Sequence, residues 1–554
     1  MINQTENSSN KLNIWLPLIF SVVLAGGMFI GMKLQKSSPV VQIKQDGSKI
    51  VGTRGEAGRV EEVIRYIESQ YVEDVDREKL IENAIEEVLS DLDPHSSYIP
   101  AKELIDVNEQ MEGNFEGVGI EFLFLEDTIM VVTPMSGGPS EQVGILPGDK
   151  IVQIEDTIVA GVKMDREKII DKLRGEKGTT VKVGIKRLDE ATLKDFTITR
   201  DRIPINSVDV GYMLDPETGY IKVSRFSATT YKEFMKYLEE LVEKQDMKHL
   251  VIDLRQNPGG YLQQATNILN QLFDQKDKLL VYTEGSSVRR NEYETTGKNF
   301  YQIGNVALLI DEGSASASEI LAGAVQDWDR GVVIGRRSYG KGLVQEQYDL
   351  KDGSALRLTV ARYYTPSKRL IQKSYSDIDN YGNDVYDRFE SGELYTKDSI
   401  HVLDTTKFYT AQGRVVYGGG GITPDLFIPL DSIVMNDYYL KVRQHLLKFS
   451  YRYFEKHKTK LEAYSLEDFS KSYNIAAAGM DDLLSYAVEN GVERDEAKFD
   501  TCRAALAQLL KTRLAKQLFG DKGYYKVKND KDPVVDAARR VVQEKNPLSQ
   551  LKKY

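Results

Sequence analysis

A serine-rich turn links an apolar segment to a helical pattern and is the first candidate for chemistry. The segment Val306 to Ile310 is apolar, the turn Gly313 to Glu319 contains three serines, and apolar residues at helical spacing follow. A serine at a helix N-terminus lies beside backbone N–H groups that lack a partner within the helix, and such groups can stabilise an oxyanion. Ser316 is therefore either a nucleophile or, together with Glu319, the capping box of a helix.

A lysine in a second glycine turn is the candidate base. Lys341 has a glycine on each side, and no histidine is close to Ser316 in the sequence. This favours a Ser/Lys hydrolase, in which the lysine amine accepts the serine proton. For that role the pKa of the amine must fall from about 10.4 to about 7, which burial away from carboxylates can achieve. Gln345 follows four residues later and could orient the amine by a hydrogen bond.

Lys341 also fits two roles without catalysis. A lysine between glycines is usually a solvated turn residue, and Gln345 would then face solvent. The run Gly335 to Lys341 also has the spacing of a phosphate-binding loop, but position 342 is glycine and an extended run follows. A phosphate-binding loop requires serine or threonine at that position and a helix after the lysine. A nucleotide site is therefore the weaker interpretation.

A third turn, Asp253 to Gly260, follows the apolar strand pattern His249 to Leu254. Functional groups gather at the carboxyl ends of strands in open α/β sheets, so we expect this turn to lie at the same edge as the serine turn. Its backbone N–H groups could complete an oxyanion hole. The alternative is a tight connection between a strand and a helix with no chemical role.

The elements that must position these turns alternate in type along the chain. From 203 to 365, apolar strand patterns alternate with helical ones, which predicts a mixed sheet covered by helices. Residues 116 to 200 show short strands with glycine turns, typical of a small mostly-β module with two helices. Residues 59 to 92 have helical spacing that ends at Pro94. The expected fold is multidomain α/β, with the mostly-β module inserted and helical segments at both ends.

Two further segments carry less information. Residues 373 to 417 are polar and rich in tyrosine, and they predict a hairpin-like excursion. After Asp431 the chain is charged and helical in pattern to about Leu518, and a basic tail follows that we expect to be frayed. Helices of this kind at a terminus often assemble with another chain, so a homodimer is expected.

Composition excludes several classes of function. The net charge of −11 argues against a general nucleic-acid binder, and the sequence contains no run of basic residues strong enough to change that conclusion. The single cysteine, Cys502, allows no intrachain disulfide. The five histidines are scattered without zinc-ligand spacing, so neither a metal nor another cofactor is expected.

One uncharged stretch, Ile14 to Met32, is long enough to span a bilayer and has lysines on both sides. A signal peptide is the alternative, but the stretch offers only a poor small-residue cleavage site. We therefore expect an uncleaved single-pass anchor in the inner (cytoplasmic) membrane. The flanking charges are nearly balanced and orient the anchor weakly, so placing the rest of the chain on the extracytoplasmic (periplasmic) side is an expectation.

Five motifs together resemble those of the carboxyl-terminal processing (tail-specific) serine peptidases. They occur in the expected order over roughly residues 59 to 430: Leu92–Ser96, Leu254–Gly260, Gly313–Ile320, Tyr339–Gln345 and Tyr364–Ser367. The module at 116 to 200 is similar to the PDZ domain of that family. The chain departs from the family at Lys368, where relatives often have glycine, and it inserts the excursion at 373 to 417.

The resemblance implies a role for particular residues. Ser316 would be the nucleophile, Lys341 the general base and Gln345 the residue that positions the lysine, and Asp327 matches a further acidic position of the family. The oxyanion donors would be the Ala317 amide and that of Gly259 or Gly260. The loop that binds a substrate carboxylate would consist of Gly117, Val118, Gly119 and Ile120.

The domain boundaries that follow are 1–35 for a cytoplasmic stub and anchor, 36–58 for a linker, 59–115 for a helical region, 116–202 for the PDZ domain, 203–430 for the peptidase core and 431–554 for a helical extension.

The function expected from the resemblance is an endopeptidase that captures protein C-termini by strand addition and cuts near them. The rival hypotheses are a non-catalytic PDZ scaffold on a degenerate peptidase fold, and a protease whose PDZ domain blocks its site.

Overall fold

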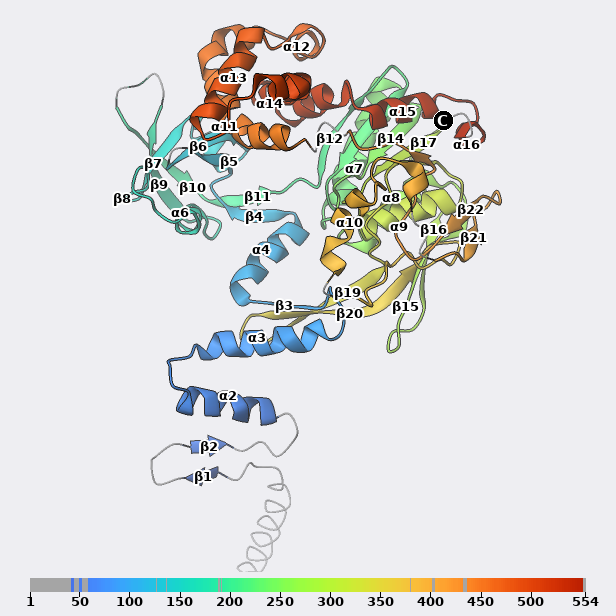
Figure 1. Ribbon diagram of the computed structural model, residues 1–554, viewed down its shortest axis with the longest axis horizontal. Helices are drawn as coiled ribbons and strands as arrows, with labels where there is room; N and C mark the ends of the chain where they lie inside the picture. Colours follow the sequence, from blue (N-terminus) through green and yellow to red (C-terminus); the bar gives the residue numbers. More distant parts are fainter. Residues whose placement is uncertain are drawn as a thin grey trace, which may run out of the picture. The chain divides into compact units, whose positions relative to one another are not determined.

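The chain divides into two compact units, Met1–Asp91 and Leu92–Tyr554. The computed structural model describes residues 41–43, 49–51, 58–125, 127–135, 137–187, 190, 192–378, 380–400, 404–431 and 436–551 (Figure 1). The expected anchor at 14–32 lies outside the described residues, as does most of the expected linker at 36–58.

The first unit contains a short hairpin and two helices. They are β1 (Val41–Ile43), β2 (Lys49–Val51), α2 (Gly58–Gln70) and α3 (Arg77–Ser90). The Asp76 carboxylate caps α3 by accepting hydrogen bonds from the first backbone N–H groups of the helix. Arg77 of α3 pairs with Glu61 of α2 at 2.9 Å, which joins the two helices. The helical pattern predicted from Arg59 onward is confirmed.

The second unit begins with β3 (Ser97–Ile99) and α4 (Ala101–Glu112) and continues into the mostly-β module. Its sheet has the order β10-β9-β7-β6-β5, which leaves β5 at an edge. The elements are β5 (Ile120–Leu125), β6 (Thr128–Pro134), α5 (Pro139–Gln142), β7 (Lys150–Ile154), β8 (Thr157–Ile158), α6 (Arg166–Leu173), β9 (Thr180–Lys186) and β10 (Lys194–Thr199). The chain enters by β4 (Asn114–Gly117) and leaves by β11 (Asp201–Pro204), which pair with each other. The predicted module with two helices is confirmed.

A central six-stranded sheet with the order β12-β13-β14-β17-β18-β23 carries the predicted turns. β12 is antiparallel to β13, and the other neighbours are parallel. The strands are β12 (Val208–Met213), β13 (Thr218–Val223), β14 (His249–Asp253), β17 (Val306–Ile310), β18 (Val332–Gly335) and β23 (Leu426–Phe427). Since β14, β17 and β18 are parallel neighbours, the three turns that follow them lie at one edge, as predicted.

Helices cover both faces of the central sheet. On one face, α7 (Thr230–Gln245), α8 (Leu262–Leu272) and α9 (Ala317–Asp327) share a core with alternate strand residues. On the other face, α15 (Pro533–Val542) packs against Tyr220, Val251 and Leu309. The prediction of a frayed tail after about Leu518 is therefore wrong. Buried residues recur at helical spacing in α15, beginning with Val534 and Val535, and the basic residues among them hid this pattern.

A second sheet has the order β16-β15-β20-β19, and β3 pairs with β20. Its strands are β15 (Lys276–Glu284), β16 (Asn291–Thr296), β19 (Leu343–Asp349) and β20 (Ala355–Tyr364).

The excursion at 373 to 417 contains the predicted hairpin, formed by β21 (Lys407–Tyr409) and β22 (Val415–Tyr417). It also contains elements that were not predicted: η1 (Tyr381–Asn383), α10 (Asp384–Glu390) and η2 (Lys397–Ser399).

The C-terminal extension has a hydrophobic core of its own. It consists of α11 (Asp437–Leu461), α12 (Leu466–Ser472), α13 (Ala477–Glu489) and α14 (Glu496–Asn529), followed by α15 and α16 (Pro547–Gln550). Gly520, with φ of 63°, interrupts the helical backbone of α14. The predicted helical extension is confirmed, and it continues well beyond Leu518.

Candidate active site

Ser316 occupies the turn between β17 and α9, at the carboxyl edge of the central sheet. Its φ of 53° and ψ of −113° place a non-glycine residue in a sparsely populated backbone conformation. Such strain costs on the order of 1–3 kcal/mol and persists where the surroundings hold it, often at functional sites. The residue is only partly buried. The turn thus presents the Ser316 side chain beside the N-terminus of α9.

The other two serines of the turn are structural. Ser314 and Ser318 are fully buried. The Ser314 hydroxyl donates to the Leu254 carbonyl at 2.8 Å, and the Ser318 hydroxyl donates to the Asn257 carbonyl at 3.0 Å. Both bonds fasten the serine turn to the turn that follows β14. Burial and bonding thus leave Ser316 as the candidate nucleophile among the three.

The turn after β14 lies directly against Ser316. A Cβ atom on Gly259 would lie 2.7 Å from the Ser316 Cβ and 3.0 Å from the Ala317 nitrogen. The Gly259 N–H donates to the Asn257 side-chain oxygen at 2.9 Å and is therefore engaged. The N–H groups of Gly260 and Ala317 donate no hydrogen bond to any residue that the structure describes. Of the three predicted donors, Gly260 and Ala317 are thus available for an oxyanion.

Lys341 lies in the turn between β18 and β19, and its amine is oriented as predicted. Its Nζ donates to the Oε1 of Gln345 on β19 at 2.7 Å. The amide nitrogen of Gln345 in turn donates to the backbone carbonyl of His95. Gln345 is therefore held on both sides, and it fixes the direction of the lysine side chain.

One buried carboxylate connects the serine turn to the lysine turn. Glu319 is fully buried and accepts hydrogen bonds from the backbone N–H groups of Ser316 at 2.9 Å and Lys341 at 2.8 Å. It also accepts from the Gly340 N–H at 2.7 Å and from the Ser338 hydroxyl. Glu319 is thus more than the partner in a capping box, because it bonds to both turns at once.

A second connection between the turns comes from β20. The hydroxyl of Tyr363 lies within hydrogen-bond distance of the Ser316 carbonyl, at 3.1 Å, and of the Lys341 carbonyl. The Tyr363 ring is buried, so the hydroxyl is held in place. The backbones on either side of the two candidate catalytic side chains are therefore fixed relative to each other.

The surroundings of Lys341 lower the pKa of its amine. Burial lowers the pKa of the Lys341 amine, and the charge of Arg357 lowers it further, while Asp93 and Glu319 oppose the shift. Burial also raises the pKa of Glu319 to about 7, although its hydrogen bonds oppose that rise. Burial, assisted by the charge of Lys341, lowers the pKa of His95 to about 4. Lys341 is partly buried, and two carboxylates act on its amine, so the condition of burial away from carboxylates is met only in part.

Asp327 does not join this group. It lies at the end of α9 opposite to Ser316, about 16 Å along the helix axis. Its carboxylate forms a buried ion pair with Arg369 at 2.8 Å and accepts the Ser367 N–H at 3.0 Å. The catalytic role expected for Asp327 is therefore replaced by a structural one, which is to hold the segment after β20. In that segment Lys368 has φ of 70°, a conformation that favours glycine.

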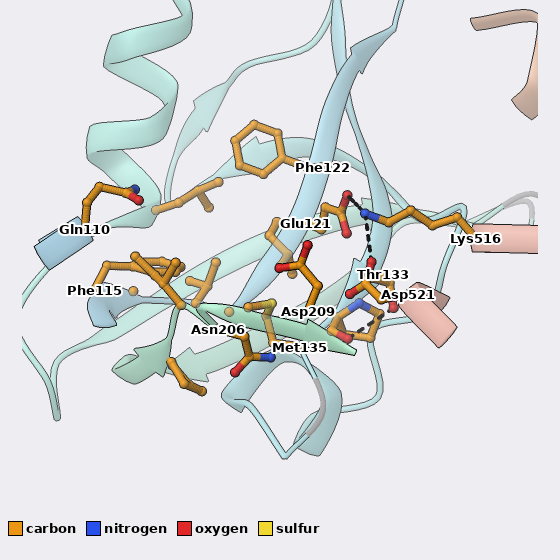
Figure 2. Close-up of a pocket in the computed structure, with 18 of the residues that line it drawn as sticks. Gln110, Phe115, Glu121, Phe122, Thr133, Met135, Asn206, Asp209, Lys516 and Asp521 are labelled. Carbon is orange, nitrogen blue, oxygen red and sulfur yellow. Dashed lines mark hydrogen bonds and ion pairs between the residues drawn. The ribbon is translucent and has the colours of Figure 1, made fainter. Parts of the chain in front are cut away.

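The predicted carboxylate-binding loop connects β4 to β5. The N–H groups of its buried residues Val118 and Gly119 donate no hydrogen bond within the described part of the chain. The Val118 carbonyl, by contrast, is bonded to the N–H and the hydroxyl of Ser140. Gly117 to Ile120 line a cavity of 1110 Å³ (Figure 2). Unpartnered N–H groups beside a cavity suit an anionic ligand.

Three residues that hold the site were not recognised from the sequence as functional. Glu319 had a visible signal, the capping-box spacing, but that pattern is explained by a helix start alone. Tyr363 had no signal, because its partners are backbone carbonyls that are distant in sequence. Asn257 had none either, because its side chain bonds to the Gly259 N–H only in the folded turn and to the distant Val223 carbonyl. Among the described residues, no cluster of side chains could hold a metal ion, and no helix is long and apolar enough to cross a membrane.

Four segments of the chain match models of known protein families. A model described as peptidase family S41 matches residues 217–380, and a PDZ domain model matches 117–199. A model described as the N-terminal domain of the activating protease CtpB matches 21–103, and a family of unknown function matches 438–520.

Individual relatives agree with these matches. The carboxy-terminal processing protease CtpB of Bacillus subtilis is 33% identical over 69% of this chain and 81% of its own length. A carboxy-terminal-processing protease of Bartonella bacilliformis is 35% identical over 58% of this chain and 73% of its own length. Among solved structures, a photosystem II D1 C-terminal processing protease matches 56% of this chain and 88% of its own, with 29% identity and a TM-score of 0.32.

The contact between Gly259 and Ser316 generates a first prediction. Gly259→Ala should slow the labelling of Ser316 by a fluorophosphonate at least about a hundredfold, because the new methyl group would clash with the serine turn and displace an oxyanion donor. Gly382→Ala is the matched control, since no heavy atom lies within 4 Å of its Cβ position. Mass spectrometry of the Ser316 peptide measures the rate. Equal labelling of the two variants would contradict the close contact.

The pKa of Glu319 generates a second prediction. Ionised Glu319 can accept hydrogen bonds from all four donors, and protonated Glu319 cannot. Wild type should therefore react with the phosphonate faster than Glu319→Gln at high pH, and this difference in rate should disappear as the pH falls through about 7. We expect wild type to react with the phosphonate at least about tenfold faster than the variant at pH 8.5, and at nearly the same rate at pH 5.5. Protonation of Lys341 slows both proteins alike, so its effect cancels in the ratio of the two rates. A ratio that does not change with pH would contradict this role.

Proposed function

Because the chain belongs to the carboxy-terminal processing proteases of peptidase family S41, a family of serine peptidases with a PDZ domain, we propose that it cuts substrates by a Ser/Lys mechanism with Ser316 as nucleophile and Lys341 as general base. The observation that carries this proposal is the bonding of the Glu319 carboxylate to the backbone of both residues. The two side chains therefore extend from one rigid frame at the edge of the sheet.

In the acylation step, the Ser316 Oγ attacks the scissile carbonyl carbon while its proton moves to the neutral Lys341 amine. Gln345 keeps that amine directed, and the lowered pKa of the amine makes the neutral form available. The oxygen of the tetrahedral intermediate accepts hydrogen bonds from the Ala317 and Gly260 N–H groups.

The lysine returns its proton to the leaving amine, and the peptide bond breaks to leave an ester on Ser316. A water molecule then attacks the ester carbonyl carbon while Lys341 again accepts a proton. Collapse of the second intermediate returns this proton to Ser316 and frees the new C-terminus. The lysine therefore has the same charge before and after each cycle.

Selection of substrate tails would fall to the PDZ domain. The unpartnered N–H groups of Val118 and Gly119 suit a terminal carboxylate, and β5 is an edge strand to which an extended tail can add. A peptide with a free C-terminus would thus bind at this loop, and its amidated form would lose the charged group that the loop recognises.

We further propose that residues 14–32 anchor the protein in the inner (cytoplasmic) membrane, with the peptidase core outside the cytoplasm. The support is the uncharged stretch itself, which has lysines at both ends and is long enough to span a bilayer. A single anchor near the N-terminus leaves the rest of the chain on one side of the membrane.

The mechanism predicts that Ser316→Ala and Lys341→Ala each lower kcat/KM for a peptide with a free C-terminus at least about a thousandfold, because each removes a group that takes part in every cycle. The exposed Lys351, on the turn that joins β19 to β20, gives the control Lys351→Ala, which should retain wild-type activity. Cleavage is read by mass spectrometry of the products. If either catalytic variant still cuts the peptide at the wild-type rate, the assignment is wrong. If wild type neither cuts nor reacts with the phosphonate, the chain is a PDZ scaffold.

The anchor has its own test. When expressed in a bacterium, the full chain should sediment with membranes and require detergent for release, because the stretch at 14–32 would be buried in lipid. A chain that begins at residue 36 should stay in the soluble fraction. In cells whose outer envelope has been opened, added protease should degrade the core of the full chain. Release of the full chain by salt alone, or protection of its core, would contradict the anchor or its orientation.

A further inference from the structure

Three parts of the second unit meet at the 1110 Å³ cavity beside the carboxylate-binding loop. The PDZ domain contributes that loop, the start of β5 and the end of α6. The peptidase core contributes Asp209 and Arg225, and α14 of the C-terminal extension contributes Arg513, Lys516 and Asp521. The place where a tail would bind is thus enclosed on one side by a helix that lies outside both the PDZ domain and the peptidase core.

Helix α14 contacts the strand that would receive the tail. The Lys516 amine lies 3.0 Å from the Glu121 carboxylate, and Glu121 is the second residue of β5. Lys516 also pairs with Asp521 of its own helix at 3.5 Å. Figure 2 shows the lysine extending from the helix toward β5, between these two carboxylates.

The carboxylates that line the cavity all have partners. Glu121 and Asp521 pair with Lys516, and Asp209 accepts hydrogen bonds from the hydroxyls of Ser224 and Tyr525. Two lining cations, by contrast, have no partner. The guanidinium groups of Arg513 and Arg225 form no hydrogen bond or ion pair with any residue that the structure describes. The cavity therefore offers unpaired positive charge and no unpaired negative charge.

The two free guanidinium groups occupy separate positions along the cavity. Arg513 lies three residues before Lys516, so the two cations share one face of α14 above the start of β5. Arg225 precedes Phe226, whose N–H donates to the Gly259 carbonyl at 2.8 Å. Arg225 is thus next to the oxyanion turn, at the side of the cavity toward the peptidase core.

We propose that α14 forms the outer wall of the tail-binding groove, and that Arg513, with Lys516 beside it, selects substrate tails that carry acidic side chains just before the terminal carboxylate. The inference rests on the proposed capture of C-termini by the PDZ domain and adds a substrate class to it. Because a strand rises about 3.3 Å per residue, a cation above the second residue of β5 faces roughly the last four residues of an added tail.

The test measures binding separately from cleavage. Two fluorescent peptides share their last residue and carry either aspartates or lysines at the three preceding positions. Binding to the full-length Ser316→Ala protein is followed by fluorescence anisotropy. The acidic peptide should bind at least about fivefold more tightly than the basic one, as expected for one or two partly exposed ion pairs. Arg513→Glu in the same protein should abolish or reverse this preference.

The control is Lys522→Glu, which makes the same charge reversal on an exposed residue of α14 that does not line the cavity. It should keep the preference of the parent protein. Equal binding of the acidic and basic peptides, or a preference that Arg513→Glu leaves intact, would overturn the inference while the proposed function stands. If the amidated acidic peptide binds as tightly as the free acid, or if no tail binds, tail capture itself fails and the inference fails with it.

Discussion

The buried Glu319 carboxylate is the interaction on which the geometry of the site depends. Burial in the core makes an ionised carboxylate costly, and the four donors that surround Glu319 offset part of that cost. Two of those donors are the backbone N–H groups of Ser316 and Lys341, which belong to turns after different strands. The carboxylate therefore converts two separate turns into one rigid frame, and the hydroxyl of Tyr363 reinforces it from β20.

The same frame explains how a lysine can act as a base. A flexible lysine on a surface turn would be solvated and positively charged, whereas Lys341 is partly buried and directed by Gln345. Gln345 is neutral, so it can accept a hydrogen bond from the amine without stabilising the charged form as strongly as a carboxylate would. Asp327, an acidic alternative, is instead paired with Arg369 at the other end of α9.

The C-terminal extension is an integral part of the second unit. Helix α15 covers one face of the central sheet, and its N-cap residue Asp532 pairs with Arg255 in the turn that follows β14. Helix α14 reaches the PDZ domain through Lys516 and Glu121. The extension thus touches both the tail-binding module and the turn that carries an oxyanion donor, which gives its helices a place in the architecture of the enzyme.

Local patterns predicted strands β14, β17, β18 and β20, the three turns and the hydrogen bond between Lys341 and Gln345, because each depends on residues that are close in sequence. The role of Glu319 could not be predicted, because its partners Gly340 and Lys341 are brought to it by strand order alone. Helix α15 was missed because its apolar residues are interrupted by charged ones and are buried only by a sheet far away in sequence. Which of Gly259 and Gly260 donates its N–H to the oxyanion could not be predicted, because the hydrogen bond from the Gly259 N–H to Asn257 is visible only in the folded turn.

The ionisation of Lys341 decides between a general base and an ordinary surface lysine. Competitive acetylation of the lysine amines in full-length Ser316→Ala protein, read by mass spectrometry at the Lys341 peptide over a range of pH, measures the pKa of that amine. We expect a value clearly below about 10.4, the ordinary pKa of lysine, because burial lowers the pKa of the Lys341 amine. A Lys341 pKa at or above about 10.4 would contradict the assignment of Lys341 as the general base.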